Sequence, residues 1–310
     1  MMIKIIDVLS YLNTRHIRYK FSGDESRTFS TFCPLNSLKK DSITWVRNSD
    51  SLDVELLNSY SGIILVAEYD ANIENNEFSV IYAENVHRTF FRIVAHFFGE
   101  MDPENRYPDI ASTAIVESGN VGKNVYIGHH TYIGPDVIIG DNVQILNNVT
   151  IQGKVSIGNF SIIESGTTIG ACGFGHYHDE SGNPVCVPHF GGVVIGDYVK
   201  IGANNTISRG CLSDTIIEDY VKTDNLVHIA HNDHIKHGAM LTACVEISGS
   251  TTIGRDVWLA PGTTVREGVD IGDRVYTGIG AAVTKNQPGG KVVVGVPARI
   301  LRDRRTDEGM

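Results

Sequence analysis

The sequence predicts a mainly β protein in which a small α/β domain, residues 1–108, precedes a long parallel β-helix, residues 109–310. Three observations support this fold class. Aliphatic residues recur at every sixth position through most of the second part, glycine often follows them, and the first part lacks this period. A chain of 310 residues exceeds the usual size of one core, so a globular unit joined to a repeat array is expected.

The aliphatic ladder is the most informative feature. Nine consecutive positions carry it, from Val121 and Ile127 at six-residue intervals to Ile169. Six is a multiple of two but not of 3.6, so the pattern predicts short strands turning at fixed intervals and excludes a continuous amphipathic helix. The ladder then resumes, slips by four residues after Ile207, and includes one polar position, Thr223. Its later aliphatic members are Ile195, Ile201, Ile207, Ile217, Ile229, Ile235, Leu241, Ile247, Ile253, Leu259, Val265 and Ile271.

Glycine follows many ladder residues, as in IGHHTY, IGPDVI and IGDNVQ, which predicts corners that need its steric freedom. With this spacing the sequence resembles the hexapeptide-repeat family over residues 110–300. The resemblance implies a left-handed parallel β-helix in which three hexapeptides form one triangular coil, with the ladder residue pointing inward. One repeat has too little apolar surface to fold alone, so the stacked coils share a continuous core.

Two segments fall outside the repeats. Residues 170–192 break the ladder with glycines, aromatics and histidines, and predict a ligand-binding loop; a solvated excursion without a role is the alternative. The first domain predicts helices around Ile5 to Asn13 and Arg88 to Phe98, with strands in SITWVRN and SGIILVAEY. The polar, proline-bearing stretch from Pro103 to Pro108 predicts the domain boundary.

Composition narrows the class of protein. A formal net charge of −10, without a long basic block, argues against nucleic acid or an anionic membrane as the main partner. Five scattered cysteines without a CxxC pair are typical of reduced thiols in a cytoplasmic protein. The apolar run at the start is short and broken by Asp7 and Asn13, which predicts no signal peptide. We therefore expect a cytoplasmic protein without membrane insertion.

Four histidines recur every third residue: His228, His231, His234 and His237. On a helix they would form one stripe and suggest a metal site. The ladder instead predicts a β-coil, where six residues carry the chain to another side of the triangle, so convergence on zinc is not expected. We predict no metal site, and a packing or surface role for His234 and His237.

His231 lies in KTDNLVHIAHND, preceded by SRGCLSDTIIED. This stretch resembles the lipid A acyltransferases that N-acylate UDP-3-O-acylglucosamine; GFG at 173–175, DESGNPV and SITWVRN extend the resemblance. It implies that His231 is the general base, and related sugar-nucleotide N-acetyltransferases also place a histidine there. The chemistry needs a base because the amine loses a proton as it attacks a thioester.

The same resemblance assigns two partners to His231. Asp224, in TDN, occupies the position of the aspartate that orients the histidine; a turn cap is the alternative. Gly249 lies one coil, eighteen residues, after His231, and its backbone N–H is the expected oxyanion donor. A plain corner glycine is the alternative there.

The candidate substrate contacts come from three parts of the chain. Trp45 is the candidate for stacking on the nucleotide base, as aromatic faces do. Phe174 and Tyr177, in the predicted loop, are the candidates for lining the acyl or sugar pocket. Asn225 and His228 lie within the stretch that resembles the lipid A family and are further candidates.

The carboxyl end, TGIGAAVTKNQPGGKVVVGVPARILRDRR, resembles hexapeptide acyltransferases that use coenzyme A. The resemblance implies that Gly262, Gly280, Lys285 and Arg299 surround this co-substrate, with the two cations near its phosphates. A solvated basic tail is the alternative.

Three departures separate the chain from the lipid A enzymes. It stops within about ten residues of the repeats, whereas those enzymes continue into a helical extension that helps to recruit acyl carrier protein. Gly268 stands where they have a second histidine, and the tyrosine expected to flank a stacked uracil is missing after Trp45.

We therefore predict an N-acyltransferase that moves an acyl group from acyl-CoA to the amino group of a nucleotide-linked amino deoxysugar, dTDP-linked, without a permanently bound cofactor. The alternatives are the UDP-3-O-acylglucosamine N-acyltransferase of lipid A synthesis using acyl carrier protein, a non-catalytic scaffold, and a metal-dependent hydratase on the same fold. Because the family's site lies in a groove between subunits, the resemblance also implies a homotrimer.

Overall fold

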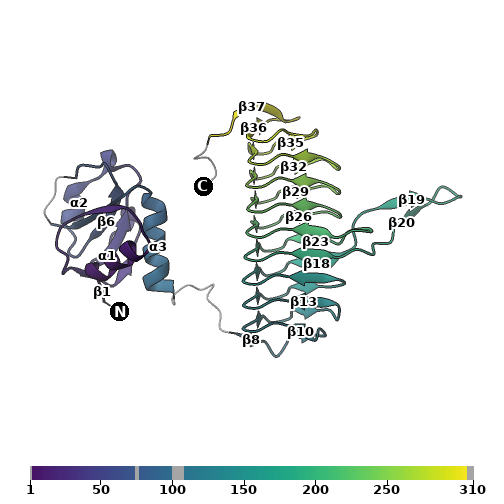
Figure 1. Cartoon of the computed structure of the whole chain (residues 1–310), viewed down its shortest axis with the longest axis horizontal. Helices are drawn as coiled ribbons and strands as arrows, with labels where there is room; N and C mark the ends of the chain where they lie inside the picture. Colours follow the sequence, from purple (N-terminus) through teal and green to yellow (C-terminus); the bar gives the residue numbers. More distant parts are fainter. Residues whose placement is uncertain (1, 74–76, 100–107, 306–310) are drawn as a thin grey trace. The chain divides into compact units, whose positions relative to one another are not determined.

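The computed structural model describes residues 2–73, 77–99 and 108–305, and it divides the chain into two units, Met1–Asn105 and Arg106–Met310 (Figure 1). Each unit has a core of its own. The predicted boundary from Pro103 to Pro108 lies outside the described residues except for Pro108. The predicted fold class, a parallel β-helix of six-residue repeats preceded by a small α/β domain, is confirmed.

The first unit is built on a five-stranded sheet of order β2-β7-β6-β5-β4, in which only β2 runs antiparallel to its neighbour. A two-stranded pair, β1 with β3, lies outside this sheet. The elements of the unit are β1 (Ile3–Lys4), α1 (Ile5–Thr14), β2 (Tyr19–Ser22), β3 (Thr28–Phe29), β4 (Thr31–Phe32), η1 (Leu35–Ser37), β5 (Ser42–Trp45), η2 (Ser49–Ser51), α2 (Val54–Asn58), β6 (Ile64–Glu68), β7 (Ser79–Ala83) and α3 (Val86–Phe98).

Both faces of this sheet are buried. Ile64 and Val66 pack in one cluster with residues of α1 and α3, whereas Leu65 and Ala67 pack in another cluster with Leu57 of α2. This alternation along β6 is the period of two that a strand imposes on its side chains. The predicted helices and strands of the unit are confirmed, and α2, β2 and β7 are additional elements.

The second unit winds through three parallel sheets in turn. The first sheet contains β10 (Asn120–Val121), β13 (Val137–Ile139), β16 (Val155–Ile157), β21 (Val193–Ile195), β24 (Thr215–Ile217), β27 (His234–Ile235), β30 (Thr252–Ile253) and β33 (Asp270–Ile271). The second sheet contains β8 (Asp109–Ile110), β11 (Tyr126–Ile127), β14 (Gln144–Ile145), β17 (Ile162–Ile163), β22 (Lys200–Ile201), β25 (Lys222–Thr223), β28 (Met240–Leu241), β31 (Trp258–Leu259), β34 (Tyr276–Thr277), β36 (Lys291–Val294) and the antiparallel β37 (Arg299–Asp303). The third sheet contains β9 (Ile115–Val116), β12 (Tyr132–Ile133), β15 (Thr150–Ile151), β18 (Thr168–Ala171), β23 (Thr206–Ser208), β26 (His228–Ile229), β29 (Glu246–Ile247), β32 (Thr264–Val265) and β35 (Ala282–Val283).

The coils stack along this helix (Figure 1), and the ladder residues of successive coils pair in register. Ile127 pairs with Ile145, eighteen residues later, and Ile145 pairs with Ile163, and all three side chains are fully buried. Burying one such side chain stabilises the fold by about 1.5–3 kcal/mol, so the core depends on the sum of the coils. Thr223, the polar position, is also buried, and its Oγ1 both donates to Asn205 Oδ1 and accepts from the Gly202 N–H, each at 3.0 Å.

The glycines after the ladder residues are needed for a different reason than predicted. Left-handed backbone at the corners falls mostly on other residues, such as Asn124 and Asn142. Gly128 and Gly158 instead lie against the next coil: an ideal Cβ would be 2.5 Å from Asn147 Oδ1 at the first and 2.4 Å from Asp197 Oδ1 at the second. Their missing side chains allow the coils to stack closely.

Two loops leave the helix beside each other. The segment between β18 and β21 forms the predicted excursion, a hairpin of β19 (His176–His178) and β20 (Pro184–Cys186) (Figure 1). The four-residue slip between β23 and β24 forms the second loop, residues 209–214. The Phe190 N–H donates to the Cys211 carbonyl oxygen at 2.7 Å, which joins the bases of the two loops.

Candidate active site

His231 lies in the turn after β26 and faces Gly249, one coil further along. An ideal Cβ on Gly249 would come within 2.7 Å of His231 Cε1 and 2.8 Å of its Nε2, closer than real Cβ atoms approach. Only glycine lets the backbone reach the imidazole in this way. Among the described residues, the Gly249 N–H donates to no other group, so it is available to an oxygen that develops charge. The structure thus brings the predicted base and the predicted oxyanion donor together.

Asn232 fixes the orientation of the His231 ring. The Asn232 amide donates from Nδ2 to the carbonyl oxygen and Oγ of Ser213, at 3.0 and 2.9 Å, and its Oδ1 accepts from the Cys211 N–H at 3.0 Å. The same Oδ1 lies 3.1 Å from His231 Nδ1. Since the amide oxygen only accepts, Nδ1 is the protonated nitrogen, and in the neutral ring Nε2 carries the lone pair beside Gly249.

Asp224 does not orient His231 within one chain. Its carboxylate accepts from the Asn225 N–H at 2.7 Å, in the exposed turn after β25. β25 belongs to a different sheet from β26, which His231 follows, so the two residues occupy different corners of the coil. The predicted pairing is therefore not formed inside a single chain, and Asn232 holds the ring there instead.

Asp233 is the most unusual carboxyl group of this region. Asp233 is fully buried. Its Oδ1 accepts a hydrogen bond from the Thr251 N–H at 2.8 Å, and its Oδ2 has no hydrogen-bond partner among the described residues. Burial raises the pKa of Asp233 to about 9, and the nearby Glu246 carboxylate adds to the rise. The carboxyl group is consequently protonated at neutral pH and places no negative charge beside His231.

His189, in the excursion loop, is a site residue that sequence reasoning missed. Its ring lies edge-on to that of His231, with the ring centroids 5.4 Å apart. An ideal Cβ on Gly173 would be 2.7 Å from His231 Cδ2 and 2.8 Å from His189 Nε2. A side chain at Gly173 would overlap both rings, so its backbone packs directly against the two imidazoles. The only sequence signals were the histidine in VPHFGG and the glycine in GFG.

The other histidines do not converge. His228 points outward from β26, whereas His234 lies on β27 in another sheet and pairs through Nε2 with Glu218 at 2.8 Å. Burial raises the pKa of Glu218, but hydrogen bonds from the His237 N–H and the His234 ring outweigh it and hold the pKa below its ordinary value. Asn225, a predicted substrate contact, uses its Oδ1 to accept from the Ala203 N–H, which joins two coils.

Phe174 and Tyr177 both project from the excursion loop. The Phe174 side chain is 90% exposed, and its ring lies 4.4 Å from that of His176. Tyr177 on β19 is also exposed. Both rings are exposed to solvent in one chain, so their predicted contact with an acyl chain or sugar stays a prediction.

The predicted donor-binding residues lie on the last coils. Gly262 and Gly280 stack one coil apart in left-handed turns, and a side chain at either position would meet almost nothing. The corner is therefore open to an approaching ligand. Lys285 follows β35 and Arg299 lies on β37, in different sheets; both are exposed, and Arg299 donates to the carbonyl oxygen of Ala298 at 3.0 Å.

Trp45, at the end of β5, is half-buried against α3, where its ring lies 5.3 Å from that of His87. It also lines a hollow of about 470 Å³ together with leucines of η1 and α2. This apolar wall suits one face of a flat ring.

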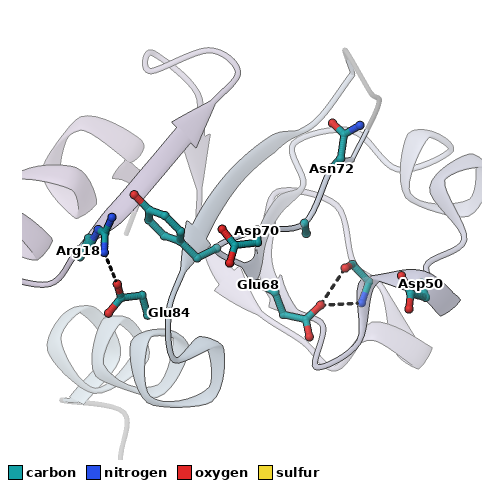
Figure 2. Close-up of a pocket in the computed structure, with 9 residues that line it drawn as sticks. Arg18, Asp50, Glu68, Asp70, Asn72 and Glu84 are labelled. Atoms are coloured by element: carbon teal, nitrogen blue, oxygen red, sulfur yellow. Dashed lines mark hydrogen bonds and ion pairs between the residues drawn. The ribbon is translucent and has the colours of Figure 1, made fainter.

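A larger hollow of about 920 Å³ lies elsewhere in the first unit (Figure 2). Asp50, Glu68, Asp70 and Glu84 line it with a single cation, Arg18, which pairs with Glu84 at 2.8 Å. Four carboxylates repel a diphosphate, so this hollow does not suit the phosphates of a nucleotide.

The six-residue pattern matches a known family model, bacterial transferase hexapeptide (six repeats), at residues 119–153 and 136–171. Residues 119–171 of the helix thus match this family. Over 136 residues the chain is 42% identical to the UDP-3-O-acylglucosamine N-acyltransferase of Herminiimonas arsenicoxydans, covering 43% of this chain and 39% of that protein. It is 46% identical over 123 residues to the protein of the same name from Delftia acidovorans, covering 39% and 36%. The chain thus spans less than half of the length of these curated relatives.

A solved structure agrees with this likeness. The UDP-N-acetylglucosamine acyltransferase from Bacteroides fragilis superimposes with a TM-score of 0.56 at 26% identity, covering 62% of this chain and 73% of that one. In the described part of the chain, no helix is long and apolar enough to cross a membrane.

These comparisons correct one prediction. The sequence was expected to encode an enzyme that uses acyl-CoA and a dTDP-linked deoxysugar. That expectation is wrong, because the matched relatives are named for UDP-3-O-acylglucosamine. That expectation relied on two departures, Gly268 and the missing tyrosine after Trp45. These single positions are weaker evidence than 46% identity over 123 residues. The names of these relatives favour the alternative prediction, which named UDP-3-O-acylglucosamine as the acceptor.

Proposed function

We propose that the chain is an N-acyltransferase whose acceptor is a UDP-linked amino sugar of the UDP-3-O-acylglucosamine type. The observation that carries the proposal is the apposition of His231 and Gly249, a base and a backbone donor held one coil apart. The names of the relatives supply the substrate class. A non-catalytic scaffold would have no need of a glycine beneath an oriented imidazole.

The reaction follows from this geometry. The neutral Nε2 of His231 takes a proton from the amine as the amine nitrogen attacks the thioester carbonyl carbon. The Gly249 N–H binds the oxygen of the tetrahedral intermediate as it gains charge. The C–S bond then breaks, the imidazolium returns the proton to the leaving thiolate, and an amide remains. Asn232 keeps Nδ1 protonated throughout, so Nε2 stays the working nitrogen.

The proposed acyl donor is a thioester on acyl carrier protein, and no resident cofactor is needed. The open corner at Gly262 and Gly280, with Lys285 nearby in sequence, is the proposed contact for the phosphopantetheine arm. The apolar hollow at Trp45 is the proposed place for the nucleotide base.

The proposed assembly is a homotrimer. Asp224 and His231 occupy different corners of one chain, so the predicted carboxylate can reach the base only from a second copy. Exposed apolar side chains around the site, including Phe174, Phe190 and Leu212, support such a contact. Analytical ultracentrifugation tests it: a species of about three times the 33.9 kDa chain is expected, and a stable monomer would exclude the trimer.

Thiol release tests the activity. The donors are acyl carrier protein and CoA thioesters of the same acyl group, and the acceptors are UDP-3-O-acylglucosamine and UDP-glucosamine, with His231→Ala as the matched inactive variant. With the carrier protein donor, we expect thiol release that depends on the acceptor. In His231→Ala the rate of this release should be lower by about a hundredfold or more. Equal rates in the wild type and His231→Ala would refute the assigned base.

A further inference from the structure

The inference concerns His189, whose imidazole borders His231 across Gly173 and has no role in the reaction so far described. The ring is 7% exposed, and its Nδ1 lies 2.8 Å from the carbonyl oxygen of Val187. A carbonyl oxygen only accepts, so Nδ1 carries the proton. In the neutral ring, Nε2 is therefore an acceptor with a free lone pair.

This acceptor is left without a partner. Nε2 of His189 is buried and makes no hydrogen bond to any residue in the described part of the chain. Leaving a buried polar atom unpaired costs about 1–3 kcal/mol, so such an atom needs an explanation. Its surroundings suggest the explanation: the atom lies under the Gly173 backbone, against which the His231 ring also packs.

The segment that covers His189, residues 173–175, places no side chain over the ring. Gly173 and Gly175 both pass over the His189 ring without a side chain; an ideal Cβ at Gly175 would be 3.5 Å from His189 Cε1. Phe174 between them is almost fully exposed, and its one ring contact among the described residues is with His176, within the same loop.

We propose that His189 Nε2 accepts a hydrogen bond from the amino group of the acceptor sugar, beside the nitrogen of His231 that removes the proton. This inference rests on the proposed function and adds a specificity-determining residue to the same site. A neutral primary amine has two N–H donors and one lone pair. With one N–H held by His231 and the other by His189, the lone pair is directed at the thioester carbon.

The same arrangement selects an amine over a hydroxyl. A sugar hydroxyl has one O–H, which satisfies His231 and leaves His189 Nε2 unpaired. Because Nε2 is already unpaired in the free chain, only the amine removes this cost, and the hydroxyl substrate binds without that gain. His189 neither gains nor loses a proton over the reaction, so the proton balance through His231 is unchanged.

Binding tests this inference independently of turnover. The imidazole nitrogens of the full chain are followed by ¹⁵N NMR while UDP-glucosamine or UDP-glucose is added at about pH 8, where much of the amine is neutral. The two sugars differ only in the amine and hydroxyl at C2. We expect the His189 Nε2 resonance to shift with UDP-glucosamine and not with UDP-glucose. Equal shifts with both sugars, or none with either, would overturn the proposal.

Kinetics provides the second arm. His189→Phe keeps a flat buried ring but removes the acceptor, and its thermal unfolding midpoint is compared with that of the wild type to exclude misfolding. We expect kcat for the amine substrate to fall by about tenfold to a hundredfold, with little change in KM. A kcat within twofold of the wild type would contradict the assignment. If the wild type itself transfers no acyl group, the proposed function fails, while an amine-specific NMR shift still upholds the amine contact at His189.

Discussion

Asp233 provides the sharpest quantitative prediction, because its carboxyl group is buried and protonated two residues from His231. We consider Asp233→Asn, which keeps an amide oxygen for the Thr251 N–H, now 2.8 Å from Oδ, and cannot ionise. The folded carboxyl has a pKa of about 9, raised by burial from the 3.8 of the exposed group. Between these values the folded chain holds a proton that the unfolded chain releases, so wild-type stability falls as pH rises.

The magnitude follows from this difference in pKa. Each pH unit within that window lowers the wild-type free energy of unfolding by about 1.4 kcal/mol relative to the variant. From pH 5 to pH 8 the variant should therefore gain up to about 4 kcal/mol over the wild type, and we expect roughly 2–4 kcal/mol after relaxation of the site. For a chain of this size, that corresponds to a gain in Tm of at least about 4 °C.

The assay is thermal unfolding of the wild type and Asp233→Asn, followed by circular dichroism at pH 5 and pH 8. Other titrating groups are common to both proteins and cancel in the difference. The midpoint of the variant relative to that of the wild type is expected to rise from pH 5 to pH 8. A gap between the two proteins that stays constant over this range would refute the protonated, buried carboxyl.

Three further predictions concern the reaction. Gly249→Ala should lower kcat by about a hundredfold, because the new Cβ meets the His231 ring. The control is Gly119→Ala, where a Cβ meets nothing within 4 Å and kcat should not change. Similar losses of kcat in both variants would count against the oxyanion role of Gly249. Asn232→Ala should lower kcat about tenfold and also reduce Tm, since two loop contacts are lost; an unchanged rate would show that the ring needs no orienting amide. Mixed trimers of Asp224→Asn and His231→Ala chains should recover part of the activity if each site combines residues of two chains. Activity no higher than that of the separate variants would place Asp224 and His231 of one site in the same chain.

Much of the fold was predictable because it repeats. The period of six predicts the strands, and the eighteen-residue coil predicts that Gly249 lies beside His231, as the structure shows. The slip of four residues after Ile207 coincides with the second loop, which was not predicted. Short elements of the first unit, such as α2 with its five residues, gave too little periodic signal to be found.

The rest of the site depends on structure that has no period. His189 reaches His231 only through the path of a loop of about twenty residues, which sequence spacing does not define. Asn232 was overlooked because its role depends on the hydrogen-bond network of the neighbouring loop. Asp224 was assigned by resemblance, and the six residues between it and His231 carry the chain to another corner.

The most direct test of the proposed reaction is mass spectrometry of the product formed from UDP-3-O-acylglucosamine and an acyl carrier protein thioester. The account predicts one added acyl group, attached as an amide that resists hydroxylamine, and its loss in His231→Ala. An added acyl group that hydroxylamine removes, or no product with this donor and acceptor, would contradict N-acylation at this site.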